Sequence, residues 1–109
     1  MDLNNIKSKF EGFNLYVQRS LSEDYWEIVI YNKDITEWEN CFFEVLGVAV
    51  KPKGQKPTPE HQNLAKDYGG IFPNQTLYAK VFDTGTLISM FWPWGNDTHT
   101  TIKTILLKK

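Results

Sequence analysis

The stretch TLYAKVFDTGTLISMFW, residues Thr76–Trp92, decides the fold, because it holds two apolar runs that meet at a glycine-containing turn. Both runs, Thr76–Phe82 and Thr86–Trp92, are rich in the aromatic and β-branched residues that strands favour. The three residues between them, Asp83–Gly85, suit a type I turn followed by a glycine at positive φ. The stretch therefore predicts an antiparallel β-hairpin.

The turn of this hairpin also raises the question of catalysis. Its sequence, VFDTGT, resembles the active-site turn of the aspartic proteases, where an apolar strand leads into Asp-Thr-Gly. The resemblance implies a homodimer, because two such aspartates share one proton and activate water. The short segment after Gly85 lacks the apolar-apolar-Gly run that supports the site in that family. We therefore interpret Asp83 as a turn residue and predict that the protein is not an enzyme.

Four further strands are predicted outside this hairpin. Leu15–Leu21 and Tyr25–Tyr31 alternate with period two around a polar loop, which indicates a second hairpin, and Thr98–Leu107 is threonine-rich and then apolar. The run CFFEVLGVAV, Cys41–Val50, is apolar on both faces apart from Glu44. Such a pattern favours a central strand that is covered on both sides.

Two helices complete the expected fold. Leu3, Ile6 and Phe10 have helical spacing, and Pro59–Tyr68 follows Thr58, a residue suited to cap a helix. The sequence predicts the α+β class, with 1–109 as one domain. We expect a single antiparallel curved sheet of five or six strands, with one N-terminal helix and one helix at about 59–68 between strands three and four, both on one face.

Composition narrows the classes of partner and location. The 12 basic and 13 acidic residues nearly cancel, which argues against a nucleic-acid binder. No run approaches the ~20 apolar residues of a membrane span, and the N-terminus lacks the pattern of a signal peptide, so we expect a cytoplasmic protein. Cys41 is the single cysteine, which rules out an intramolecular disulfide. His61 and His99 lack metal-site spacing, and we expect neither a metal nor a cofactor.

Six residues are candidates for binding a partner or ligand. Pro93 cannot donate a ladder hydrogen bond, so one of its tryptophan neighbours is expected at the rim of the sheet. A further tryptophan lies between two glutamates, and three lysines lie in a proline-rich loop. The candidates are Trp38, Trp92, Trp94, Lys51, Lys53 and Lys56. The alternative is that the tryptophans pack on the core and the lysines belong to a solvated connection.

The aromatic surplus without a catalytic set favours a non-catalytic protein-interaction module, because aromatic side chains dominate interface hot spots. A small bacterial or phage protein of the inhibitor or immunity type, with an as yet unidentified protein partner, is the leading hypothesis. One alternative is a small-molecule or carbohydrate-binding protein whose concave sheet is lined by aromatics. Another is a self-associating domain that forms a homodimer.

Overall fold

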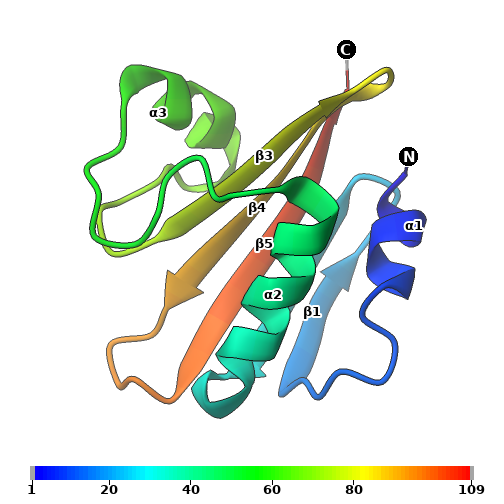
Figure 1. Cartoon of the computed structure of the whole chain (residues 1–109), viewed down its shortest axis with the longest axis vertical. Helices are drawn as coiled ribbons and strands as arrows, with labels where there is room; N and C mark the ends of the chain where they lie inside the picture. Colours follow the sequence, from blue (N-terminus) through cyan, green and yellow to red (C-terminus); the bar gives the residue numbers. More distant parts are fainter. Residues whose placement is uncertain (1, 109) are drawn as a thin grey trace.

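The computed structural model describes residues 2–108 and contains one five-stranded antiparallel sheet (Figure 1). The strands are β1 (Val17–Leu21), β2 (Tyr25–Tyr31), β3 (Thr76–Phe82), β4 (Gly85–Pro93) and β5 (His99–Lys108). Their order across the sheet is β1-β2-β5-β4-β3, so the first hairpin is joined to the C-terminal strand. The expected α+β class, the antiparallel pairing and both hairpins are confirmed.

Helices lie on both faces of this sheet, which corrects the expectation that they share one face. The short α1 (Leu3–Ser8) and the longer α2 (Ile35–Leu46) pack on one face, here called the inner face. On the opposite, outer face lies α3 (Pro59–Ala65), which continues as the 3₁₀ turn η2 (Lys66–Tyr68). Each face of the sheet has its own apolar cluster, and burying both requires cover from both sides.

The expectation of a central strand over Cys41–Val50 is wrong, because most of this run belongs to α2. The helix begins at Ile35, after the 3₁₀ turn η1 (Asn32–Asp34), and buries Trp38, Phe42 and Leu46. These three residues are four apart and therefore share one helix face. The next residue after Phe42, Phe43, is 54% exposed, and its presence made the run look apolar on both sides.

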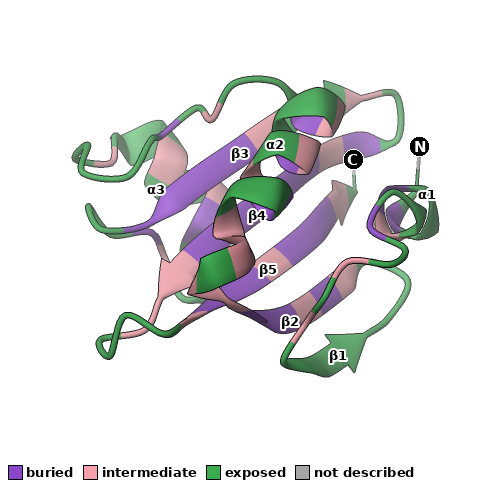
Figure 2. Cartoon of the chain, turned by 60° about the horizontal axis from the view of Figure 1, so that its bottom comes forward, coloured by how far each residue is buried: buried purple, intermediate pink, exposed green. Residues whose placement is uncertain are grey.

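The inner core is largely aromatic. In β2, Trp26, Ile28 and Ile30 alternate inward and are buried beneath α1 and α2, as the period of the strand predicts. Phe10 stacks on Trp38 with ring centroids 4.9 Å apart and an interplanar angle of 13°. Figure 2 shows the buried inner positions on the strands and the exposed outward side of α2.

The β3–β4 turn differs from the expected three-residue loop. Phe82 pairs with Gly85, so the loop contains two residues, and Gly85 already belongs to β4. The φ of Gly85 is +151°, and an added Cβ would overlap the carbonyl oxygen of Leu107 on β5. Glycine is therefore required here for both backbone conformation and close approach.

The cap predicted for α3 is confirmed. The Thr58 hydroxyl accepts from the His61 amide at 3.2 Å, and His61 Nδ1 accepts from the Thr58 amide at 3.1 Å. This reciprocal pair is a capping box with histidine in the place of the usual glutamate or glutamine. His61 thus has a structural role at the start of α3. None of the helices within residues 2–108 is long and apolar enough to cross a bilayer.

Candidate functional site

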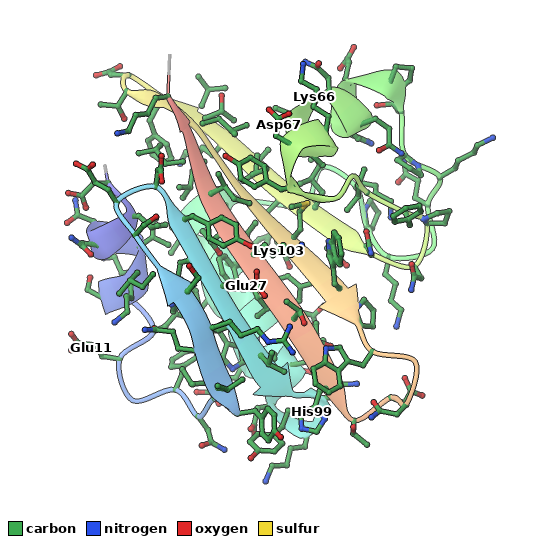
Figure 3. All side chains as sticks on the ribbon, turned by 180° about the vertical axis from the view of Figure 1, so that it is seen from behind. Glu11, Glu27, Lys66, Asp67, His99 and Lys103 are labelled. Atoms are coloured by element: carbon green, nitrogen blue, oxygen red, sulfur yellow. The ribbon has the colours of Figure 1, made fainter. Side chains whose placement is uncertain are left out.

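The outer face of the sheet is only partly covered. Ala65 of α3 packs with Leu77 and Ile88 over β3 and β4, while the part of this face nearer β1 carries no helix. Figure 3 views the molecule from this side, with Glu27 and Lys103 on the uncovered strands and His99 at their far end. The uncovered part combines charged and aromatic side chains, and we call it the open face.

Three charged residues cross the open face in one row. Glu27 of β2 is directly opposite Lys103 of β5 in the register. Arg19 lies at the irregularity in the β1–β2 register, between the paired residues Gln18 and Ser20, and the bulge aims its side chain at Glu27. Arg19, Glu27 and Lys103 are called the charged row.

The Glu27 carboxylate contacts Arg19 and Tyr25. It lies 3.5 Å from Arg19 Nη1 and also accepts a hydrogen bond from the Tyr25 hydroxyl. Burial and this bond to Glu27 raise the pKa of Tyr25. The Glu27 side chain is 18% exposed, whereas that of Arg19 is 46% exposed. Arg19 is therefore the member of this pair that solvent or a partner reaches more easily.

Lys103 turns away from its register partner. Its ammonium lies 3.6 Å from the centroid of the Trp92 ring and donates to the Tyr68 carbonyl at 3.3 Å. Burial lowers the pKa of Lys103, Glu27 raises it and Arg19 lowers it again. Because the cation lies over an aromatic face, part of its lost hydration is replaced by a cation–π contact.

Four rings gather beside the charged row and form what we call the aromatic cluster, namely Tyr16, Tyr31, Trp94 and His99. The His99 ring lies at the centre, with centroids 4.5 Å from Tyr16, 4.8 Å from Trp94 and 5.3 Å from Tyr31. Tyr16 is 52% exposed, so the cluster reaches the surface. Its members come from β2, β5 and the segments that flank β1 and β4, which only the folded sheet brings together.

Arg19 joins the aromatic cluster to the charged row. Its guanidinium carbon lies 5.7 Å from the centroid of the Trp94 ring, and its Nη1 contacts Glu27. Trp94 is itself held in place, because its Nε1 donates to the Thr101 hydroxyl at 2.9 Å. The guanidinium is thus in contact with both a carboxylate and an indole.

Trp92 has a more structural position than Trp94. An added Cβ on Gly69, which ends η2, would overlap the six-membered ring of Trp92, so the two are in direct contact. The Trp92 Nε1 is buried and has no hydrogen-bond partner within residues 2–108. Trp92 therefore packs the end of η2 against the sheet, and its ring makes the cation–π contact with Lys103.

The structure removes Trp38 from the exposed residues. Trp38 is fully buried in α2, with Phe10 stacked on it and Phe13 edge-on at 5.1 Å. The two neighbouring glutamates suggested an exposed loop, but they flank the indole on a helix whose inner side carries Trp38, and only Glu37 is exposed while Glu39 is half-buried. Trp38 belongs to the core and is unavailable to a partner.

Lys51 is likewise not a surface cation. It is fully buried, and its ammonium donates to the carbonyl oxygens of Pro52 and Pro73, both at 3.0 Å, and of Gln75. Lys53 and Lys56 are exposed on the same loop between α2 and α3. The expected cationic loop therefore has two surface lysines, and these lie on a different element from Trp92 and Trp94.

Sequence reasoning missed Arg19, Lys103, Tyr16 and His99 as members of one site. The alternation in β2 did place Glu27 on the side opposite Trp26, and a similar alternation places Lys103 with Thr101 in β5. The sequence contains no indication that β2 pairs with β5, because the two strands are distant along the chain. The Arg19 bulge has no mark in the sequence either.

The part of the chain that the structure describes has two concavities outside the open face. One of about 720 Å³ lies at the end of the sheet near α1 and is lined mainly by polar residues, including Asp2, Glu23, Asp83 and Lys108. A smaller one lies beside Cys41, whose thiol pKa is raised by burial and by Glu44. The described residues contain no group of three or more His, Cys, Asp or Glu that could hold a metal ion.

Comparisons of the chain with protein-family models, with curated proteins and with solved structures find no match. The chemistry of the open face itself is therefore what supports a functional proposal.

Proposed function

We propose that this chain is a non-catalytic protein-interaction module that binds its partner through the open face. The observation that carries the proposal is the position of Arg19, which is held between the Glu27 carboxylate and the Trp94 ring and is 46% exposed. An arginine fixed in this way has already lost side-chain entropy, so a partner that binds it meets a smaller ordering cost.

The residue types of the open face are those that protein interfaces favour. Arginine, tryptophan and tyrosine are enriched in binding hot spots, and they occur here side by side as Arg19, Trp94, Tyr16 and Tyr31. Tyr16 is 52% exposed, while Trp94 is half-buried, and both rings contact His99. This arrangement favours a contact surface with rigid anchors at its centre and a wetter rim.

A carbohydrate-binding or small-molecule function has less support. Small ligands are usually enclosed by concave, mainly apolar pockets with aromatic linings. The concavity of about 720 Å³ near α1 is instead bordered by Asn4, Asn5 and Thr84 together with charged side chains, and no tryptophan or tyrosine lines it. A broad partner surface fits the open face better than an enclosed ligand.

Photo-crosslinking in cells of the organism that produces the protein tests the proposal. A photoreactive phenylalanine analogue is placed at Tyr16, on the open face, or at Val81, which is 73% exposed on β3. We expect a discrete protein adduct from position 16 that is lost when Arg19→Glu is added. Position 81 serves as the control and should give no such adduct.

The same experiment contains the outcome that contradicts the proposal. An adduct of equal yield from positions 16 and 81, or one that persists with Arg19→Glu in a protein with an unchanged melting curve, would show that the open face does not select the partner. Adducts to a second copy of the chain would instead support the self-associating alternative.

A further inference from the structure

The charged row carries more positive than negative charge. Arg19 and Lys103 lie on either side of Glu27, so the row holds two cations and one anion. The anion is already engaged by Arg19 Nη1 and by the Tyr25 hydroxyl. One positive charge on this part of the surface therefore has no matching carboxylate within the row.

The unmatched charge lies where water has been partly removed. Lys103 is half-buried over the Trp92 ring, and its one hydrogen bond to a residue in the range 2–108 goes to the Tyr68 carbonyl. The lowered pKa of Lys103 has burial as its first cause, and Arg19 contributes through charge repulsion. An added anion near both cations would relieve the repulsion and replace the hydration that Lys103 has lost.

We infer that the partner presents the carboxylate of an acidic peptide segment to Arg19 and Lys103. This inference rests on the proposed function, and it names the chemistry of the partner at the same site. The guanidinium offers a planar fork of donors to a carboxylate, and the ammonium adds a point charge. The rings of Trp92 and Trp94, which lie against these cations, supply apolar surface for the residues next to the acidic one.

Charge balance selects this occupant over others. A basic segment would face two cations with only an already engaged Glu27 to offset them. A phosphorylated segment brings a charge of about −1.5 to −2, which exceeds the single unmatched charge of the row. One carboxylate neutralises the row, and the half-buried site strengthens its interaction with both cations.

The inference is tested by selecting a random peptide library, displayed on phage, against the immobilised full chain. We expect the selected peptides to share an Asp or Glu next to an apolar or aromatic residue. A synthetic peptide of that consensus should lose roughly tenfold or more in affinity towards Arg19→Gln and towards Lys103→Met. The Met variant keeps the apolar stem that packs on Trp92, so its fold should be preserved.

Lys80→Met is the matched control, because Lys80 is exposed on β3 and away from the charged row. This variant should bind the consensus peptide as the wild type does, and circular dichroism should show that all three variants are folded. A selection without any binder, or with peptides that carry no acidic residue, overturns the inference.

The failure of this inference can be told apart from the failure of the proposed function. Peptides that bind Arg19→Gln and Lys103→Met as tightly as the wild type, but fail to bind Trp94→Ala, would overturn the inference that a carboxylate is recognised. They would still support the open face as the docking surface. Peptides whose binding is unchanged by all three substitutions overturn both.

Discussion

At the scale of single residues, Lys51 shows how a charged side chain serves the fold. The three donors of its ammonium match the three carbonyl oxygens of Pro52, Pro73 and Gln75. Its backbone also pairs with Leu77, at the otherwise free edge of β3. Lys51 therefore connects the loop after α2, the segment before β3 and β3 itself.

Replacing Lys51 by methionine should test this role. The apolar stem is kept, but the carbonyl groups of Pro52 and Pro73 each lose one of two donors, and the buried bond to the Gln75 carbonyl is lost. We therefore expect a loss of about 1–3 kcal/mol in the free energy of unfolding. Lys53→Met, on the exposed part of the same loop, should change it by less than about 0.5 kcal/mol. Urea unfolding of both variants gives the comparison, and equal stabilities would contradict the structural role of Lys51.

Tyr78 links the stability of the protein to alkaline pH. Burial, with the Glu39 carboxylate as the second cause, raises the pKa of Tyr78 to about 12 from 10.0. Below pH 10 both folded and unfolded states are protonated, and the stabilisation is complete. As the pH rises further, the unfolded state loses its proton first, so stability falls towards pH 12.

Tyr78→Phe should make this alkaline loss of stability less steep, because the substituted ring has no proton to lose. The measurement is the free energy of unfolding of the wild type and the variant at about pH 9 and about pH 11. An identical decrease in both proteins would show that other groups account for the whole effect.

At the scale of elements, α2 is where sequence and structure disagree most. Trp38, Phe42 and Leu46 form its buried side, and the run that follows Cys41 was expected to be a strand with both faces covered. Alternation and helical spacing overlap in a short apolar run, so the exposed Phe43 was sufficient to mislead. The β3–β4 hairpin and the N-terminal cap of α3 were predicted correctly, but the hairpin loop has two residues instead of three, and α3 lies on the outer face and comes between β2 and β3 in the chain.

The two neighbouring phenylalanines give a direct test of α2. In a doubly covered strand both would be buried, whereas in α2 Phe42 is fully buried and Phe43 is 54% exposed. We expect Phe42→Ala to cost about 3–5 kcal/mol of unfolding free energy, and Phe43→Ala less than about 1 kcal/mol. Comparable losses in thermal or urea unfolding would favour the strand.

At the scale of the whole molecule, the distribution of cover on the sheet decides where function can lie. The inner face is closed by α1 and α2, and α3 closes the half of the outer face over β3 and β4. The open face remains uncovered. Within residues 2–108, neither edge of the sheet is a long, regular strand with free backbone groups. β1 is short and has its bulge at Arg19, while Lys51 pairs with Leu77 on β3.

The irregular edge at β1 and the paired edge at β3 predict that the protein is a monomer in the absence of its partner. Short, bulged or covered edge strands discourage pairing with another copy. Sedimentation equilibrium over a wide range of protein concentration should give the mass of one chain, 12.7 kDa. A concentration-dependent dimer that Arg19→Glu dissociates would favour the self-associating alternative and require the open face to be reassigned.

The sequence by itself determined the α+β class, both hairpins and the capped helix α3, because alternation, turn residues and caps act between neighbours in the chain. Only the tertiary structure decided the strand order, the burial of Trp38 and Lys51, and the union of Arg19, Glu27 and Lys103 in one row. The physical reason is distance along the chain: β2 and β5 are far apart in the sequence, so no local pattern specifies that they pair. The open face is a product of that pairing.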